Sequence, residues 1–299
     1  MATLENSTTG AGGDYEMEDA SISVLDGENK DDAVLDPIAE QQKRRWILIR
    51  AVLGELLCTF LFVYVLCATA ANFVRLKTVD NPTIGAISTG FAAVALIYSF
   101  ADISGAHFNP AVTFATCVTR KTSITKGLMY IGAQLVGAVL AALILLATFP
   151  GDDFNGKTAA AAVAIKPAND ANIANAFLTE LILTFILVYV IFAVAFDTVD
   201  DNVKVVRGSK TQGNNLTIYT TSGATKAGFA PIAIGFTLGF LCFMGGSVSG
   251  GAFNPARVFG TALVGNVWNA HWMYWIADFL GAGMAGYAQK FFATKGKAN

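Results

Sequence analysis

Long runs of apolar residues, separated by short polar segments, dominate the chain from about residue 46 onward. A helix that crosses the hydrocarbon core of a bilayer needs about 20 predominantly apolar residues. Six stretches are long enough and predict six transmembrane helices, at 47–72, 84–101, 127–149, 173–196, 228–246 and 268–292. The pattern therefore predicts an all-α membrane protein.

Two further apolar segments, 109–119 and 254–264, are too short to cross, because a rise of about 1.5 Å per residue carries each only about halfway through a bilayer. Both begin with the same tripeptide, Asn-Pro-Ala, whose proline suits the first position of a helix. The two copies are Asn109, Pro110, Ala111 and Asn254, Pro255, Ala256. They predict two re-entrant half-helices, each entered from a loop.

The two halves of the chain repeat one another. The run from Glu55 to Tyr64 resembles the run from Glu180 to Tyr189, 125 residues later, whereas the two Asn-Pro-Ala motifs lie 145 residues apart. The difference of 20 residues indicates an insertion between the fourth and fifth spans. Three spans per half is an odd number, so the second half is inverted relative to the first. Such a 3+3 inverted repeat places its functional site near the bilayer midplane.

Charge is distributed unevenly along the chain. Residues 1–42 hold 11 of the 22 acids and one of the 20 bases. Only 14% of all residues are charged, against about 25% in soluble domains, which excludes an ordinary soluble enzyme and argues against a nucleic-acid binder. With both termini inside, 15 bases lie on the inner side and four outside, so both termini are predicted to be cytoplasmic. The sequence leaves open whether the membrane is the plasma membrane or that of an intracellular vacuole.

These boundaries divide the chain into five parts. We expect a disordered acidic cytoplasmic tail at 1–45, a first repeat at 46–149, an extracellular linker at 150–172, a second repeat at 173–292 with an inserted cytoplasmic loop at 197–227, and a cytoplasmic C-terminus at 293–299.

Residues that could perform catalysis or bind metal are scarce. The four cysteines lie in or beside apolar runs, and only two histidines occur. No His/Cys cluster has the spacing of metal ligands, and neither a phosphate-binding loop nor a nucleophile elbow is present. We therefore expect no enzymatic activity, no metal and no cofactor.

Two half-helices that enter from opposite faces would meet at their N-termini near the midplane. Each N-terminus behaves like roughly half a positive charge, and the amides of Asn109 and Asn254 would add donors there. A pore of this kind repels cations and orients a passing water with its oxygen toward the asparagines. That orientation interrupts the chain of water hydrogen bonds along which protons would hop.

At this point the sequence resembles the major intrinsic protein family, the aquaporins and aquaglyceroporins. The resemblance covers about 46–292 and rests on the segments Ser104–Thr113 and Gly250–Arg257, on the paired glutamates and on His271–Trp275. It implies a passive channel for water in a right-handed six-helix fold, surrounded by lipid and assembled as a homotetramer with one pore per protomer.

The resemblance also assigns a selectivity filter, made of Thr89, Cys242, Gly251 and Arg257. Three small side chains suggest a wide opening that passes glycerol or urea, whereas Tyr274-Trp275 and the lack of an acid after Arg257 are typical of water channels. Water alone and water with small neutral solutes both stay open.

The same resemblance gives Glu55 and Glu180 the role of bracing the loops before the half-helices, with His107 as a further brace; proton relay is the alternative for the two acids. Asp278 is an acid at membrane depth. We expect it to pair with a base near the inner interface, with proton sensing as the alternative.

The insertion within 197–227 is polar and carries Lys204, Arg207, Lys210 and Tyr219. It is interpreted either as a tolerated surface insertion or as a gate over the cytoplasmic mouth that phosphorylation could shift. The remaining alternatives are a glycerol/urea-type facilitator, an alternating-access transporter, and a closed or regulated channel-like junction protein.

Overall fold

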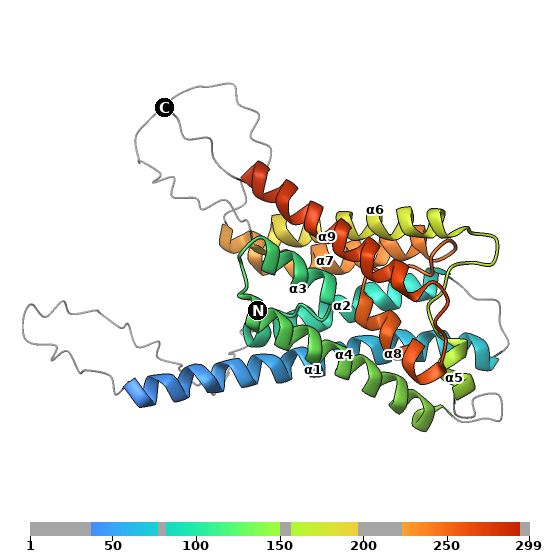
Figure 1. The fold of residues 1–299 in the computed structure, drawn as a ribbon, viewed down its shortest axis with the longest axis horizontal. Helices are drawn as coiled ribbons and strands as arrows, with labels where there is room; N and C mark the ends of the chain where they lie inside the picture. Colours follow the sequence, from blue (N-terminus) through green and yellow to red (C-terminus); the bar gives the residue numbers. More distant parts are fainter. Residues whose placement is uncertain (1–36, 77–81, 150–156, 197–222, 294–299) are drawn as a thin grey trace, which may run out of the picture. The chain divides into compact units, whose positions relative to one another are not determined.

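The computed structural model describes residues 37–76, 82–149, 157–196 and 223–293, and every element in these ranges is helical. The chain divides into two compact units, Met1–Gln41 and Gln42–Asn299, and the second contains all of the elements described below apart from the start of the first helix. Its first half runs α1 (Pro37–Leu76), α2 (Pro82–Ser104), α3 (Pro110–Val118) and α4 (Ile124–Thr148) (Figure 1).

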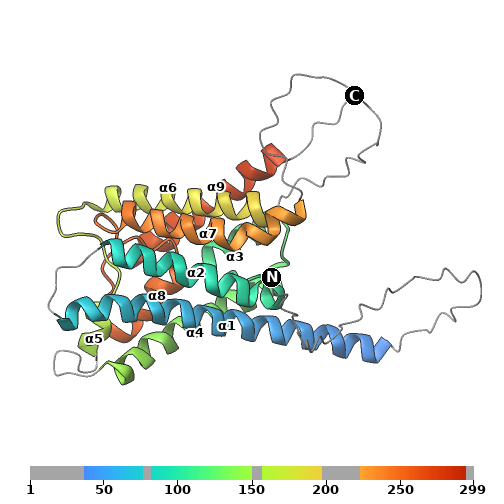
Figure 2. The same cartoon turned by 180° about the vertical axis from the view of Figure 1, so that it is seen from behind.

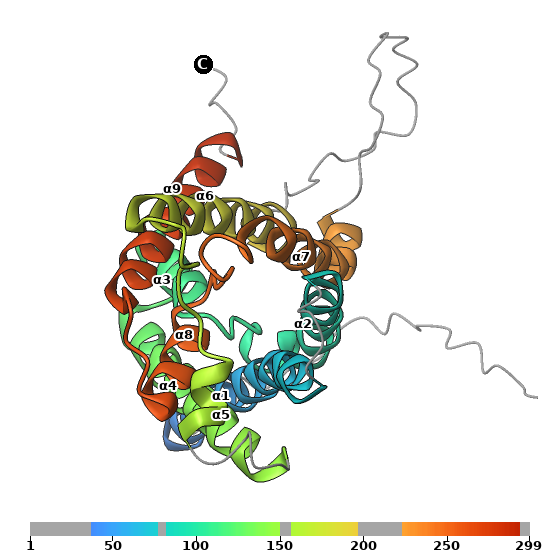
Figure 3. The same cartoon turned by 90° about the vertical axis from the view of Figure 1, so that its right-hand side faces the viewer.

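The second half has the same order of long and short helices. After the short helix α5 (Lys157–Ala162) it runs α6 (Ile173–Ile191), a π-helical turn η2 (Phe192–Phe196), α7 (Gly223–Gly245), α8 (Pro255–Gly265) and α9 (His271–Ala293). Viewed along the helices, the six long ones surround α3 and α8 (Figure 3). The expected fold class, six long helices with two half-helices, is confirmed.

Five of the long helices are long and apolar enough to cross a membrane by themselves: α1, α2, α4, α6 continued through η2, and the Gly228–Gly245 part of α7. The sixth, α9, has 23 residues and is less apolar because Asp278 and several glycines lie within it. It is nevertheless long enough to cross, at about 34 Å. In contrast, α3 has nine residues and α8 has 11, so neither is long enough to cross a membrane.

Glycines set the closest helix contacts, and they do so in matching places of the two halves. Helices α2 and α7 lie side by side (Figure 2). Gly90 of α2 and Gly235 of α7 face each other, and a Cβ on Gly90 would lie 2.9 Å from the carbonyl oxygen of Gly235. Gly137 brings α4 against the backbone of α1, and Gly281 brings α9 against the backbone of α6 in the same way. Small residues allow this close approach where lipid supplies no hydrophobic drive for association.

The start of the first helix differs from the boundary expected. Helix α1 begins at Pro37, so residues 37–45, which we expected in the disordered tail, are helical. Proline is favoured at a first helical position, and the Glu, Gln, Lys and Arg residues that follow are good helix formers although they are not apolar. Within the expected linker 150–172, α5 forms a short helix that packs against α8.

Candidate functional site

The two half-helices are capped by the asparagines of the repeated motif. The side-chain oxygen of Asn109 accepts a hydrogen bond from the Ala111 amide at 2.8 Å, and that of Asn254 accepts one from the Ala256 amide at 3.0 Å. The prolines Pro110 and Pro255 are the first residues of α3 and α8. Both motifs therefore start helices as the sequence indicated, with the asparagine one residue outside.

The two caps are also bonded to each other's loops. Asn109 Nδ2 donates to the carbonyl oxygen of Phe253 at 2.6 Å, and Asn254 Nδ2 donates to that of Phe108 at 2.8 Å. These reciprocal bonds hold the N-termini of α3 and α8 together inside the bundle. An amide nitrogen has two N–H groups, so each asparagine keeps one for a molecule in the adjoining cavity.

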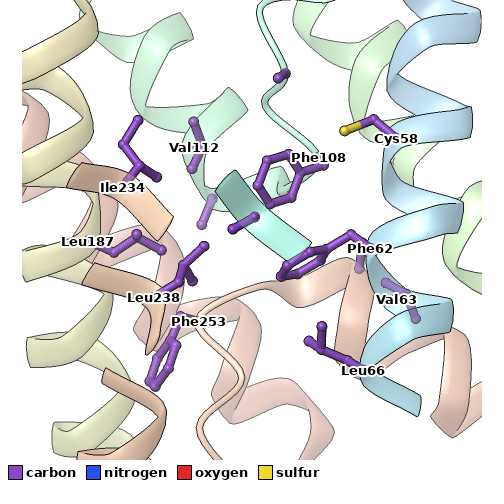
Figure 4. Packing of buried hydrophobic residues seen from close by; sticks show 14 of the residues in the cluster. Cys58, Phe62, Val63, Leu66, Phe108, Val112, Leu187, Ile234, Leu238 and Phe253 are labelled. Atoms are coloured by element: carbon purple, nitrogen blue, oxygen red, sulfur yellow. The ribbon is translucent and has the colours of Figure 1, made fainter. Parts of the chain in front are cut away.

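That cavity has a volume of about 290 Å³, and both asparagines line it. Its wall is mainly apolar, with contributions from α1, α2, α6 and α7 as well as from both loops; Figure 4 shows several of these side chains, among them Phe62, Leu187, Ile234 and Leu238. The polar lining residues besides the asparagines are Thr89, Asp102, His107 and Arg257. An apolar passage with a few polar groups presents few partners to a solute, which favours rapid passage over tight binding.

The loops before the half-helices have unusual backbone conformations. Ala106, Phe108 and Phe253 have φ values of 48°, 34° and 50°, in the left-handed region that residues with a Cβ avoid. Such conformations cost about 1 kcal/mol or more each and persist only where the surroundings enforce them. Here a buried glutamate does so in each half.

In the first half, Glu55 of α1 accepts four hydrogen bonds. Its Oε1 accepts from Ser104 Oγ at 2.6 Å and from the His107 amide at 2.9 Å, and its Oε2 accepts from the Phe108 amide at 2.7 Å and from Gln134 Nε2 at 2.8 Å. Glu55 is fully buried. The carboxylate thus fixes the loop that leads into α3.

In the second half, Glu180 of α6 has the equivalent position. Its Oε1 accepts from Ser249 Oγ at 2.5 Å and from the Ala252 amide at 2.9 Å, and its Oε2 accepts from the Phe253 amide at 2.8 Å. A tyrosine on the last helix of each half completes the arrangement: Tyr130 donates to the carbonyl of Ser104 and Tyr274 to that of Ser249.

The predicted filter residues gather around Arg257, which lines the cavity. Arg257 Nη1 donates to the carbonyl oxygen of Gly251 at 2.5 Å, and the thiol of Cys242 lies beside Arg257 and Thr89. Of the four, Thr89 and Arg257 line the cavity. Thr89 is almost fully buried and donates its hydroxyl to the carbonyl of Gly85, one turn earlier.

Comparison with known proteins identifies the family. Residues 42–289 match the model of the family described as major intrinsic protein. This chain belongs to that family. It is therefore an integral membrane channel and not an enzyme, as the sequence predicted.

Relatives with the same family architecture cover most of the chain. It is 76% identical over 287 residues to Aquaporin-B of Dictyostelium discoideum, covering 95% of this chain and 98% of that protein. It is 36% identical to an aquaporin of Encephalitozoon hellem, covering 84% and 97%. The solved aquaglyceroporin of Plasmodium falciparum has the same fold, with a TM-score of 0.63 at 23% identity over 83% of this chain and 96% of that one.

His107 lies between the first brace and the cavity of this channel. Its Nδ1 lies 3.1 Å from Thr113 Oγ1, its backbone amide is held by Glu55, and the imidazole lines the cavity. The ring contacts Tyr130 edge-on at a centroid distance of 5.3 Å. The imidazole is thus fixed on two sides by protein groups.

Sequence reasoning missed Phe196, which also lines the cavity. Its ring lies 6.1 Å from that of His107, and Lys121 Nζ lies 5.9 Å from its centroid. Phe196 ends the π-helical turn η2, which changes the helix register from that of α6. A uniformly apolar sequence carries no signal for such a turn. Leu238 was also missed, although it lies one turn before Cys242 on the same face of α7.

Asp278 has neighbours other than those expected. It is fully buried on α9, its Oδ1 accepts a hydrogen bond from Thr184 Oγ1 at 3.1 Å, and the carboxyl group of Glu180 lies within hydrogen-bonding reach. The expected pairing with a base near the inner interface is wrong. Asp278 lies in the middle of α9, and its carboxyl group contacts residues of α6 instead of a base near a helix end.

The remaining two predictions concern metal binding and gating. Within the described ranges, no group of three or more His, Cys, Asp or Glu side chains is arranged to hold a metal ion. The candidate gating residues Lys204, Arg207, Lys210 and Tyr219 lie outside the described residues.

Proposed function

We propose that this protein is a passive channel that conducts water through the cavity between the half-helices and excludes ions and protons. The observation that carries the proposal is the reciprocal pair of hydrogen bonds between each asparagine and the opposite loop, beside a cavity that both asparagines line. Relatives named aquaporins, up to 76% identical over nearly the whole chain, support water as the substrate.

The mechanism follows from the half-helix N-termini. Each contributes roughly half a positive charge, so a cation at the junction is repelled. A water molecule there turns its oxygen toward the remaining N–H groups of Asn109 and Asn254, and its own hydrogens then point away along the passage. Because two successive waters cannot both donate through that point, the hydrogen-bonded chain that carries protons is interrupted. Arg257 adds a full positive charge to the lining of the cavity.

Small neutral solutes are the runner-up substrates. Thr89, Cys242 and Gly251 are small and surround Arg257, which leaves room for a glycerol- or urea-sized molecule. The aquaglyceroporin similarity does not favour this alternative, since at 23% identity it bears on the fold alone.

The substrate is tested by stopped-flow measurement of vesicles that contain the purified protein, under gradients of water, glycerol and urea. We expect water permeability well above that of empty vesicles. Replacing Thr89→Phe together with Cys242→His should reduce any glycerol flux far more than water flux, because both changes narrow the opening beside Arg257. Glycerol flux without water flux would reject the proposal in favour of a solute facilitator, and a saturable, ion-dependent flux would indicate a transporter.

The loop 197–227 is proposed to gate the inner mouth, on the ground that it is an insertion relative to the first half and carries basic and hydroxyl residues. The test is deletion of 203–222, with osmotic swelling of vesicles as the readout. Permeability that rises on deletion supports a gate that closes the pore, and unchanged permeability supports a tolerated insertion. If the full-length protein does not conduct water and the deletion variant does, the loop regulates the channel.

Assembly and orientation are proposals as well. We infer a homotetramer with one pore per protomer and both termini in the cytoplasm, from the family resemblance and from the excess of Lys and Arg on one side of the predicted spans. The location is proposed to be the plasma membrane or the membrane of an intracellular vacuole. Cross-linking in native membranes tests the tetramer, and protease access to an epitope placed at either terminus tests the orientation.

A further inference from the structure

The carboxyl pair formed by Glu180 and Asp278 has no counterpart in the first half of the molecule. Asp278 follows Gln134 by 144 residues, and Tyr274 follows Tyr130 by the same 144. Each tyrosine donates to the serine carbonyl of its own loop, so the residues four positions later, Gln134 and Asp278, are equivalent. The first half thus has an amide beside its glutamate where the second half has an acid.

In the first half the amide is a donor. Gln134 Nε2 donates to Glu55 Oε2 at 2.8 Å and to Thr113 Oγ1 at 2.9 Å. The Glu55 carboxylate therefore receives its fourth hydrogen bond from a neutral N–H group. A carboxylate at position 278 cannot replace that group, since an ionised acid has no hydrogen to donate.

The surroundings of the pair do not neutralise two negative charges. Both side chains are fully buried, and the groups that act on them are the hydroxyls of Thr184 and Ser249, the backbone amides of the loop and each other. Two buried like charges in contact cannot both ionise.

The elements packed against α9 also lack a cation directed at the pair. They are α6, α3, α8 and η2, whose titratable or charged side chains are Glu180, Tyr189, Cys117 and Arg257. Of these, Glu180 alone acts on Asp278. Arg257, which lines the cavity, instead directs its guanidinium to the carbonyl of Gly251.

A buried oxygen of Asp278 that lacks a hydrogen-bond donor in the described part of the chain also indicates a protonated acid. Among the described residues, no N–H or O–H group donates to Asp278 Oδ2, which is buried. A buried carboxylate oxygen without a donor is costly, whereas a protonated Asp278 has an O–H group that can donate to the neighbouring Glu180.

We propose that Glu180 and Asp278 share one proton, so that Asp278 acts as a carboxylic-acid donor in the place that the Gln134 amide occupies in the first half. Asp278 is then a positioning residue: it acts through Glu180, which holds the amides of Ala252 and Phe253. It does not line the cavity, so the shared proton is kept apart from the water path.

Infrared spectroscopy of the full-length protein in lipid vesicles at neutral pH tests the proton directly and needs no open pore. We expect the wild type to show a C=O stretching band of a protonated carboxyl that shifts in D₂O and is absent from Asp278→Asn. Other protonated acids cancel in this difference. A difference spectrum without such a band would overturn the proposal.

The first half supplies a matched control. The change Gln134→Glu places a second carboxyl against Glu55, and we expect it to add a protonated-carboxyl band. Should Asp278→Asn fail to accumulate, Thr184→Val serves instead: the band is expected to stay but to move in frequency, because Thr184 donates to Asp278 Oδ1. Absence of the band, or a band that does not move, would contradict the assignment.

The positioning role is tested by rescue. Asp278→Asn keeps an N–H donor and is expected to unfold within about 2 °C of the wild type, whereas Asp278→Leu, of similar shape but without a donor, should unfold at least about 3 °C lower. Equal thermal stability of the two variants would show that Glu180 needs no donor from this position.

Discussion

The two loops that lead into the half-helices have nearly the same backbone but different side-chain support. Phe108 and Phe253 have φ values of 34° and 50°, and both have their amides held by a buried glutamate. Around Glu55, however, the network continues through neutral donors, whereas around Glu180 it continues through an acid. Both halves thus keep a carboxylate that accepts the backbone N–H groups of the loop. The other hydrogen-bond partners of that carboxylate differ between the halves.

The difference extends to two further positions. Ala252 and Val258 follow His107 and Thr113 by 145 residues, the distance between the two asparagines of the motifs. The first half therefore has a linked set of polar side chains that includes His107 and Thr113, and the second half has apolar residues in their place. Thr184 bonds across to α9, whereas its counterpart Thr59 bonds to the carbonyl of Glu55 in its own helix. The loop of the first half is held by more side-chain hydrogen bonds. We therefore expect substitution of Glu55 to destabilise the protein more than substitution of Glu180.

Removal of each glutamate should give the largest effect. Glu55→Leu leaves four buried donors without an acceptor, at about 1–3 kcal/mol each, so we expect a loss of at least about 4 kcal/mol or failure to fold. Glu180→Leu leaves three such donors, together with the O–H that we propose on Asp278; because that O–H can turn to the nearby Thr184 hydroxyl instead, the cost should be smaller. Thermal unfolding in detergent measures both. A larger loss for Glu180→Leu would reverse the comparison.

We expect substitutions of the two asparagines to have similar effects, unlike substitutions of Glu55 and Glu180. Asn109→Asp and Asn254→Asp keep the oxygen that caps each half-helix but remove the N–H groups that bond to the opposite loop and face the cavity. We expect each variant to lose about 1–3 kcal/mol from the unpaired carbonyl and to conduct water more slowly, by similar factors. Swelling of vesicles measures the rates, and a strong effect at only one asparagine would show that the junction is not symmetric.

Exchange of the hydroxyl between halves should have unequal effects, and its second member the smallest effect of all. Thr113→Val leaves His107 Nδ1 and one N–H of Gln134 without a partner, at about 1–3 kcal/mol each. Val258→Thr adds a hydroxyl that can bond to the carbonyl of Asn254, as Thr113 bonds to that of Asn109, so it should cost less than about 1 kcal/mol. Chemical or thermal unfolding measures the pair. Equal costs would mean that the polar network of the first half contributes nothing to its stability.

Features with a local signal could be predicted from the sequence. The starts of α3 and α8 follow from Asn-Pro-Ala, which combines a capping side chain with a proline that fits the first helical position. The paired glutamates were found because the two halves repeat. The span 173–196 is recovered as α6 and η2, although the π-helical turn within it was not foreseen, since it depends on packing rather than on apolar pattern.

Features that depend on contacts between helices could not be predicted. The partners of Asp278 come from α6, almost 100 residues earlier, and nothing near Asp278 in the sequence indicates them. Phe196 was read as part of an apolar span, and only the altered register of η2 directs it to the cavity. The start of α1 was misplaced because hydropathy reports the membrane-embedded part of a helix and not its polar extension.

One stopped-flow experiment measures whether water passes through the junction of α3 and α8. Vesicles with the full-length protein, with the 203–222 deletion and with that deletion combined with Asn254→Asp are exposed to the same osmotic gradient, with empty vesicles as the baseline. We expect water permeability above baseline in at least the deletion variant, and a clear decrease on adding Asn254→Asp. Baseline permeability in both the full-length and the deletion protein, or an unchanged rate with Asn254→Asp, would contradict conduction through this junction.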